Sequence, residues 1–212
     1  RRKLVTPHTG LGILRCPTCG VEVLEDQPSP AELRAIYDGA RYYESWGSSQ
    51  EIAGPVSQMK RKTFAVTFRE LVKYRKTTGR VLDIGCAFGT SLEVAREWGW
   101  DAYGLEMNAY AAASARAKFG DRIIEEDFAS AALPERFYDA VLMSDVLEHL
   151  PDPLKALRKV NALLRPDGLA VITTPCTDSL SAKLMRRFWH HRKVEHLFYL
   201  SRRSLSILLD RA

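Results

Sequence analysis

The chain has 212 residues, of which 46% are hydrophobic and 27% are charged, and 31 Lys and Arg against 26 Asp and Glu give it a net charge of +5. This composition is typical of a globular domain with a hydrophobic core, and it excludes a disordered or collagen-like chain. The charge is compatible with an anionic ligand, but it falls short of the basic surface of a dedicated nucleic-acid binder, so nucleic acid is not an expected partner.

The cysteine pattern points to a reducing compartment. Cys16 and Cys19 form a CxxC pair, whereas Cys86 and Cys176 lie far apart. Because this is no disulfide framework, we expect a cytoplasmic protein. No apolar run is long enough to span a bilayer, and the basic start is not followed by a signal-type apolar core, so no membrane partner is expected. The missing initial Met suggests a fragment.

The N-terminal third differs from the rest of the chain. Residues 1–28 hold the CxxC pair and many turn formers, and residues 29–78 are expected to form a helical extension. This extension begins with the helix start Ser29-Pro30-Ala31-Glu32 and continues with a loop over 47–58 and a helix over 58–73. We therefore expect two small segments ahead of the main domain.

Residues 79–212 are predicted to form that main domain. The pattern predicts strands over 80–84, 102–105, 122–125, 140–143 and 169–174, and helices over 90–98, 109–119 and 153–164. Asp152 and Pro153 mark the start of the last helix, and Arg165 to Gly168 supply a turn into the last strand. This alternation predicts an α/β fold with a parallel sheet, whose ligands bind beyond the carboxyl ends of the strands.

The stretch VLDIGCAFGT, residues 81–90, predicts a strand, a tight turn and a helix start. Gly85 and Gly89 allow a ligand to approach the backbone, and the helix N-terminus offers N–H donors to an anion. Asp83 lies inside the strand, where a carboxylate suits a ligand with a cationic amino group. A nucleotide-dependent oxidoreductase is the alternative, but the GxGxxG spacing is absent.

Acids also follow the next two predicted strands. Glu106 ends the second strand, where a carboxylate can accept both hydroxyls of a ribose. Asp127 and Phe128 follow the third strand, and they suit the amino group and the ring of adenine. Together with Asp83, these residues describe a site for a nucleoside that carries an amino acid.

Residues 80–175 resemble a class I S-adenosylmethionine-dependent methyltransferase. The resemblance is carried by VLDIGCAFG, by Glu106 in GLEMN, by Asp127, by FYDAVLMSDVLEHLPDP and by LLRPDGLAVITTP. It implies a Rossmann-like, mostly parallel sheet and S-adenosylmethionine as the cofactor. The cofactor-binding residues that it implies are Asp83, Gly85, Cys86, Gly89, Glu106, Met107, Asp127, Phe128 and Ser144.

The resemblance also implies a missing part of the sheet. In the family, two more strands follow the helix that LSRRSLSILLDRA resembles, but this chain stops at Ala212. We therefore expect a core that lacks the last two strands. Either the sequence is a C-terminal fragment or a partner chain completes that edge. Because an open strand edge favours association, the expectation is a homodimer or else a truncated, weakly active protein.

The stretch SDVLEHLPDP, residues 144–153, carries the candidate catalytic groups. A general base is needed when the methyl acceptor is a hydroxyl or an acidic carbon, and His149 suits that role because its pKa can lie near neutrality. Asp145 is assigned to catalysis with it. The alternative is that His149 only fixes the loop by hydrogen bonds.

A divalent metal site is a further alternative for this stretch. Asp145, Glu148 and His149 are spaced i, i+3 and i+4, so one helical turn would place them on one face. Together with His196 they offer two carboxylates and two imidazoles to a metal. The pattern is similar to the ExxEH arrangement of small-RNA 2′-O-methyltransferases and ubiquinone-pathway O-methyltransferases, with Asp145 in place of the first Glu.

The remaining segments concern zinc, the acceptor and a lid. The CxxC pair resembles half of a zinc ribbon, but even with His8 the ligand set is one short of four, so structural zinc is not expected. Residues 183–203 are rich in basic and aromatic side chains, which indicates either a pocket for a small anionic acceptor or a solvated basic face. Tyr42, Tyr43 and Trp46 indicate either a lid over the cofactor or ordinary core packing.

These features predict S-adenosylmethionine-dependent methyl transfer to a small metabolite, with O-methylation ahead of C- or N-methylation. The alternative is a non-catalytic S-adenosylmethionine-binding or scaffold subunit that a partner chain completes. The sequence specifies the cofactor more closely than the acceptor.

Overall fold

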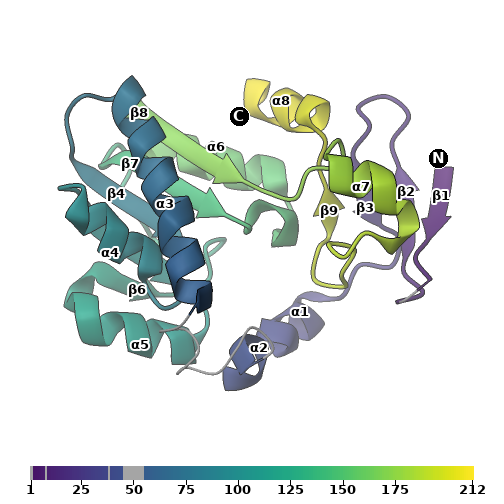
Figure 1. Ribbon diagram of the computed structural model, residues 1–212, viewed down its shortest axis with the longest axis horizontal. Helices are drawn as coiled ribbons and strands as arrows, with labels where there is room; N and C mark the ends of the chain where they lie inside the picture. The colour runs from purple at the N-terminus through teal and green to yellow at the C-terminus, as the bar shows by residue number, and fades with distance from the viewer. Residues whose placement is uncertain (1, 8, 38, 45–54) are drawn as a thin grey trace. The chain divides into compact units, whose positions relative to one another are not determined.

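The computed structural model describes residues 2–7, 9–37, 39–44 and 55–212 (Figure 1). The contacts of the chain divide it into two compact units, which we describe separately. Unit 1 consists of Arg1–Ile36, Asp145–Lys159 and Thr173–Ala212, and unit 2 consists of Tyr37–Ser144 and Val160–Ile172. The boundaries of the three consecutive domains expected from the sequence stay predictions.

Unit 2 is built on a five-stranded sheet with the strand order β6-β5-β4-β7-β8. The strands are β4 (Arg80–Ile84), β5 (Asp101–Glu106), β6 (Ile123–Glu125), β7 (Tyr138–Ser144) and β8 (Leu164–Thr173). β4 pairs in parallel with β5 and with β7, and β5 pairs in parallel with β6. This mostly parallel, Rossmann-like sheet confirms the predicted fold class.

Helices accompany this sheet, because a mostly parallel sheet needs cover on its buried faces. The helices are α2 (Ala40–Glu44), α3 (Pro55–Tyr74), α4 (Thr90–Glu97), α5 (Ala109–Phe119) and α6 (Pro153–Leu163), the last of which is divided between the units. α3 packs on α4, α4 on β5, and α5 on β6.

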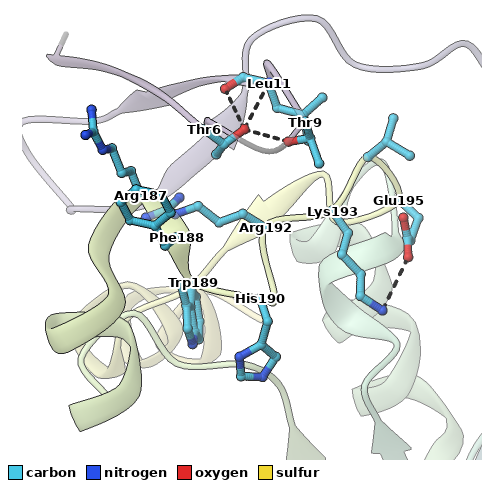
Figure 2. Close-up of a pocket in the computed structure, with 11 residues that line it drawn as sticks. Thr6, Thr9, Leu11, Arg187, Phe188, Trp189, His190, Arg192, Lys193 and Glu195 are labelled. Atoms are coloured by element: carbon cyan, nitrogen blue, oxygen red, sulfur yellow. Dashed lines mark hydrogen bonds and ion pairs between the residues drawn. The ribbon is translucent and has the colours of Figure 1, made fainter.

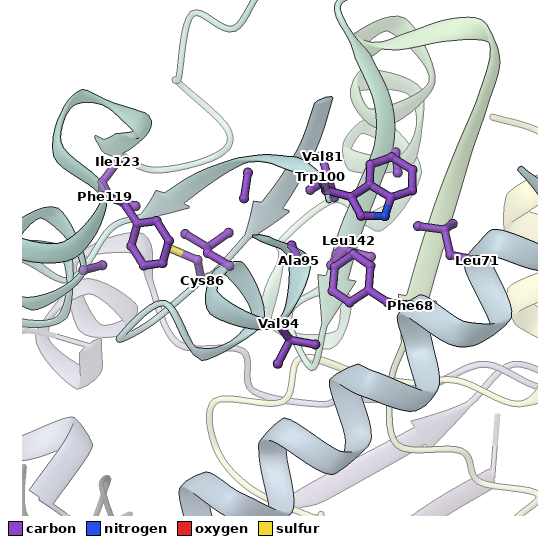
Figure 3. Close-up of a cluster of buried hydrophobic side chains, with 14 of the residues drawn as sticks. Phe68, Leu71, Val81, Cys86, Val94, Ala95, Trp100, Phe119, Ile123 and Leu142 are labelled. Carbon is purple, nitrogen blue, oxygen red and sulfur yellow. The ribbon is translucent and has the colours of Figure 1, made fainter. Parts of the chain in front are cut away.

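The core beneath these helices joins side chains of α3, the strands and the loops between them (Figure 3). Phe68 of α3 is fully buried, and its ring lies 6.3 Å from that of Trp100, which precedes β5. Truncation of such a core phenylalanine to alanine costs about 3–5 kcal/mol of unfolding free energy. This core holds the strand ends in place.

Two predicted turn features have different outcomes. Asp152 caps α6 as predicted, because its Oδ1 accepts a hydrogen bond of 2.9 Å from the Lys155 N–H. The turn predicted over Arg165 to Gly168 is wrong, since these residues belong to β8, which begins at Leu164. Among the described residues β8 is the last strand in the order of this sheet, and an edge strand is where proline, which lacks an N–H donor, is usually found.

Unit 1 contains a second, antiparallel sheet that the sequence did not reveal. Its order is β1-β2-β3-β9, formed by β1 (Arg2–Val5), β2 (Gly12–Arg15), β3 (Glu22–Leu24) and β9 (Phe198–Tyr199). The remaining elements are α1 (Pro30–Tyr37), which ends at the start of unit 2, the 3-10 turns η3 (Leu147–His149) and η4 (Arg186–Phe188), and the helices α7 (Leu180–Met185) and α8 (Arg202–Asp210). The start of α1 fits the predicted signal, because Ser29 and Glu32 bond to each other.

Within the described residues, no helix combines the length and the apolar character needed to cross a bilayer.

Candidate active site

The carboxyl ends of β4, β5, β6 and β7 bring the predicted cofactor residues of unit 2 to one edge of the sheet. Ile84 pairs with both Leu105 and Met143, and Glu106 pairs with Glu125. Because these strands run in parallel and in register, the residues after them lie along the same edge. We call this part of unit 2 the carboxyl edge.

Asp83 is buried in β4 with one carboxylate oxygen unpartnered. Its Oδ2 accepts a hydrogen bond from the Ser91 hydroxyl, whereas Oδ1 has no partner among the described residues. Burial raises the pKa of Asp83 to about 7, and the Ser91 hydrogen bond opposes that rise. A buried acceptor without a donor is costly, so this carboxylate fits a ligand that brings an N–H donor, such as a cationic amino group.

The glycine turn ties β4 to the end of β5. The N–H groups of Gly85 and Cys86 both donate to the Leu105 carbonyl, over 2.8 and 3.1 Å. Gly85 has φ 76°, which favours glycine. Gly89 has φ 81°, and a Cβ there would meet the Phe119 ring, so this glycine also serves packing. The turn is thus fixed by the fold before any ligand arrives.

Cys86 has its side chain in the core, 4% exposed, where burial raises the pKa of its thiol. A Cβ added at Gly104 would collide with the Cys86 sulfur, so the thiol points toward β5. Only the backbone of Cys86 is therefore available to a cofactor at the carboxyl edge.

Glu106 is held by donors on both carboxylate oxygens. Its Oε1 accepts from the Asn108 N–H over 2.8 Å, and its Oε2 accepts from the Ala87 N–H over 2.9 Å and from the Tyr43 hydroxyl over 3.4 Å. Burial raises the pKa of Glu106, and the backbone donors oppose the rise by stabilising the ionised form. The side chain is thus oriented and 4% exposed.

The remaining predicted cofactor residues differ in exposure. Asp127 orders its own loop, since its Oδ1 accepts from the Ala129 N–H over 2.9 Å, and the neighbouring Phe128 is buried. Met107 is 40% exposed, and Ser144 at the end of β7 is half-buried. Of the predicted lid, Tyr42 and Tyr43 lie in α2, whereas Trp46 is outside the described residues.

In unit 1, three of the four predicted metal ligands form one cluster. One ligand atom each from Glu148, His149 and His196 lies within 4.8 Å of the others. Asp145 does not belong to this group. The helical turn predicted over these residues is wrong for Asp145, because η3 starts only at Leu147 and Asp145 has the left-handed φ of 54°.

Hydrogen bonds orient two members of this cluster. The Nδ1 of His149 lies 2.8 Å from the Glu195 carbonyl, which can only accept, so Nδ1 carries the proton and Nε2 carries the lone pair. The Oε2 of Glu148 accepts from the Thr174 hydroxyl over 2.9 Å. The other Glu148 oxygen, Oε1, and the Nδ1 of His196 are buried without a partner among the described residues.

Burial also dominates the titration of the cluster. It raises the pKa of Glu148 to about 7, and it lowers the pKa of both His149 and His196. The neighbouring His149 adds to the lowering at His196, and their ring centroids lie 4.7 Å apart. Both imidazoles are therefore neutral at physiological pH, which is the form that binds a metal or accepts a proton.

The basic segment of unit 1 lines a pocket of about 550 Å³ (Figure 2). Thr6, Thr9 and Leu11 lie on one side of it, and side chains between Arg187 and Glu195 lie on the other. Part of the positive charge is already paired, since Arg192 lies 2.9 Å from Glu22 and Lys193 lies 3.6 Å from Glu195. The pocket mixes basic and aromatic side chains, as the sequence suggested.

The CxxC thiols are free, and hydrogen bonds from the Cys19 and Thr18 backbone lower the pKa of Cys16 to about 7. Neither thiol belongs to a group of three or more clustered ligands among the described residues, and His8 lies outside them. The expectation that this chain holds no structural zinc stays a prediction.

Several contributing residues were not singled out from the sequence. The Ser91 hydroxyl donates a hydrogen bond to Asp83, the Asn108 N–H donates one to Glu106, and the Thr174 hydroxyl donates one to Glu148. A signal existed for Asn108, which caps α5 through a bond from the Ala111 N–H. The partners of Ser91 and Thr174 depend on tertiary packing, which no local pattern reveals.

Comparisons with known proteins agree with this geometry. A family profile described as "Methyltransferase domain" matches residues 56–212. A SAM dependent methyltransferase of known structure from Archaeoglobus fulgidus is 27% identical, with a TM-score of 0.57, over 71% of this chain and 67% of that one. A structure from Thermotoga maritima, described as a possible histamine N-methyltransferase, is 19% identical with a TM-score of 0.60, over 82% and 80% of the two chains, and supports the fold alone.

Curated sequences match a shorter part of the chain. A ubiquinone biosynthesis O-methyltransferase from Aeromonas salmonicida is 32% identical over 101 residues, which cover 45% of this chain and 42% of that protein. The chain thus matches somewhat less than half of the length of these curated relatives.

Proposed function

Since the chain belongs to the methyltransferase-domain family of S-adenosylmethionine-dependent proteins, we propose that it transfers a methyl group from S-adenosylmethionine to a small-molecule acceptor. The observation that carries the proposal is the carboxyl edge of unit 2, where a buried carboxylate without a donor, a glycine turn and an oriented second carboxylate lie together. When bound, S-adenosylmethionine supplies a methyl group that its sulfonium has already activated.

The residues of the carboxyl edge have distinct proposed roles in holding that cofactor. Asp83 accepts from the amino group of its methionine part, which removes the cost of the unpartnered Oδ1. Glu106 accepts from the ribose hydroxyls, and Asp127 with Phe128 contacts the adenine. Gly85, Cys86 and Gly89 contribute backbone, and Met107 and Ser144 border the site. Alignment of the methyl group with the acceptor and exclusion of water supply most of the acceleration.

His149 is our proposed general base. Its proton on Nδ1 points at the Glu195 carbonyl, so Nε2 is the ring atom that can take a proton from an acceptor. Burial keeps the imidazole neutral at physiological pH. This favours an acceptor that must lose a proton, and O-methylation is therefore ahead of N-methylation. The O-methyltransferase names of the curated relatives are consistent with that order. The assignment of Asp145 to catalysis together with His149 stays a prediction.

As the alternative to the base role, we propose that Glu148, His149 and His196 hold a divalent cation, because the single lone pair on His149 Nε2 can bind a metal or accept a proton but not both. Their donor set, one carboxylate and two imidazoles, suits manganese, iron or zinc. A cation there would satisfy Glu148 Oε1 and His196 Nδ1, which are otherwise buried without partners. The chain's own part is to hold the donors in place through Thr174 and the Glu195 carbonyl.

Binding of a cation to this cluster can be tested without measuring methyl transfer. Co²⁺ added to the purified chain should give the visible absorption of a protein-bound site, and His196→Ala should lose it. His190→Ala, which removes an exposed histidine of the same unit, should keep it. A featureless Co²⁺ spectrum in the wild-type protein would rule out the metal site and leave the role of general base for His149.

An anionic acceptor is our proposal for the pocket in Figure 2, on the basis of its basic lining. Labelled methyl transfer from S-adenosylmethionine onto fractionated metabolites would identify the acceptor. If charge-neutral fractions alone became labelled, the anionic class would be wrong. A homodimer stays a prediction, which the mass of the chain in solution checks.

The alternative function is a non-catalytic S-adenosylmethionine-binding or scaffold subunit. Calorimetry with S-adenosylhomocysteine separates these cases in two steps, because an enzyme and a binding subunit both give heat, whereas a scaffold gives none. Methyl transfer to any acceptor then separates the enzyme from the binding subunit. Absence of heat in the wild-type chain would refute the proposed function.

A further inference from the structure

Tyr43 lies on the carboxylate that we assign to the ribose. Its hydroxyl donates to Glu106 Oε2 over 3.4 Å, and its ring packs against Phe88 of the glycine turn with centroids 4.8 Å apart. Burial raises the pKa of Tyr43 far above its ordinary value, so the hydroxyl is protonated and acts as a donor. Tyr43 thus reaches the carboxyl edge from α2, a segment more than sixty residues earlier in the chain.

Asn108 fastens this segment to the same strand end. Its side-chain amide donates to the Tyr37 carbonyl over 2.5 Å and to the Gly39 carbonyl over 2.9 Å, directly ahead of α2. Its Oδ1 accepts from the Ala111 N–H over 3.0 Å, so the amide is fixed by the start of α5. Two residues after Glu106, Asn108 therefore sets the position from which Tyr43 reaches the carboxylate.

The acceptor capacity of Glu106 is almost used up in this arrangement. An ionised carboxylate has about four lone-pair positions. The N–H groups of Asn108 and Ala87 and the Tyr43 hydroxyl occupy three of them. A ribose that donates through both hydroxyls needs two. The backbone donors belong to the strand end and the glycine turn, so the Tyr43 hydroxyl is the donor that can leave.

We infer that Tyr43 competes with the cofactor's ribose for Glu106 and releases the carboxylate when the cofactor binds. The inference rests on the proposed function, because it takes Glu106 as the ribose acid. Tyr43 is then an affinity-setting residue. It satisfies Glu106 in the free protein, and its displacement subtracts one hydrogen bond from the binding energy of every nucleoside ligand at this site.

The test is calorimetry with S-adenosylhomocysteine on wild type, Tyr43→Phe and Tyr110→Phe. Tyr43→Phe keeps the ring on Phe88 and removes only the competing donor, so it should bind the ligand about two- to fivefold more tightly. Tyr110→Phe is the matched control, because its ring also contacts Phe88, at 5.9 Å, on the same turn. It should bind like the wild type.

A second measurement follows the segment itself. The amides of α2 should exchange faster with solvent deuterium when S-adenosylhomocysteine is bound, because the Tyr43 contact is lost. Asn108→Ser keeps a helix-capping oxygen and removes both bonds to the segment, so it should raise this exchange without ligand. Equal or slower exchange of wild-type α2 in the complex would contradict the release of Tyr43.

The outcomes separate the inference from the proposed function. Binding by the wild-type chain that is unchanged or weaker in Tyr43→Phe overturns the competition while the cofactor site stands. Weaker binding would make Tyr43 a ligand of the cofactor instead. Failure of both proteins to bind would overturn the proposed function and the inference together.

Discussion

Two regions of the molecule bury ionisable side chains, and they differ in how these side chains are hydrogen-bonded. One is the carboxyl edge of unit 2, and the other is the Glu148–His149–His196 cluster of unit 1. At the carboxyl edge, Glu106 receives backbone donors on both oxygens, and Asp83 keeps one oxygen open. In the cluster, Glu148 and His196 each keep a buried polar atom without a partner, and no backbone N–H of the described residues satisfies either. The acceptors of the carboxyl edge therefore suit a ligand with N–H and O–H donors, whereas the unpartnered atoms of the cluster suit a cation or a proton.

Loss of Glu106 should have the largest effect on cofactor binding. Glu106→Ala removes the acceptor of two charge-assisted ribose bonds, so binding of S-adenosylhomocysteine should weaken by about 100-fold or more. Glu125→Ala, at the paired position of β6, is the control, since its carboxylate is exposed and pairs with Arg116. Calorimetry measures both, and equal losses in the two variants would count against a specific ribose acid.

His149 should affect the rate but not the binding of cofactor. His149→Ala removes the proposed base, and methyl transfer should fall by about 10²–10⁴-fold. The affinity for S-adenosylhomocysteine should stay within about twofold, because none of the proposed cofactor contacts is lost. Glu125→Ala, the control for binding above, should leave the rate unchanged. A rate that is insensitive to His149→Ala would leave the histidine a purely structural role.

The sequence predicted more of the arrangement at the carboxyl edge than of the arrangement in the Glu148–His149–His196 cluster. Asp83, Glu106 and Asp127 could be singled out because parallel strands bring their carboxyl ends to one edge, so a local pattern predicts residues that lie along the same edge. The union of Glu148 with His196 depends on a tertiary contact, in which the Leu197 N–H donates to the Glu148 carbonyl over 2.9 Å. Helical spacing pointed to Asp145 as well, but its left-handed backbone breaks the turn.

The antiparallel sheet of unit 1 illustrates the same limit. Val23 of β3 pairs with Phe198 of β9, and no short-range pattern in residues 1–28 predicts this pairing. Short strands paired over such a separation have weak local signals, because their stability comes from the pairing itself. The strands of unit 2 were easier to predict, since each is a buried apolar run followed by an amphipathic helix.

The pH dependence of cofactor binding should report Asp83. Burial raises its pKa to about 7 in the free protein, so lowering the pH below 7 protonates the acceptor of the amino group. Affinity for S-adenosylhomocysteine should then fall by up to about tenfold per pH unit. Calorimetry between pH 5.5 and pH 8 measures the trend, and Asp83→Asn should abolish it. A flat profile in the wild type would argue against an Asp83 contact.

The stability of the free protein should change in the opposite direction. Because the folded-state pKa of Asp83 lies above its ordinary value, its contribution to the unfolding free energy is present at low pH and is lost as the pH rises toward 7. Asp83→Asn should flatten this part of the denaturation profile. The same slope in wild type and variant would assign the effect to other groups, such as Glu106.

Thr174 should have a smaller effect than Glu106 or His149, and it concerns the Glu148–His149–His196 cluster. Thr174→Val removes the donor that orients Glu148, so the affinity for Co²⁺ should fall by about tenfold. Thr174→Ser keeps the hydroxyl and should bind Co²⁺ like the wild type. If both variants bound Co²⁺ equally well, the Thr174 hydroxyl would have no part in holding the carboxylate.

A crystal structure with S-adenosylhomocysteine would test the central claim most directly. We expect the amino group of the ligand at Asp83 Oδ1, its ribose on Glu106 with the Tyr43 hydroxyl displaced, and its adenine beside Asp127 and Phe128. Ligand density away from the carboxyl edge, or ribose hydroxyls that do not reach Glu106, would contradict the proposed cofactor site.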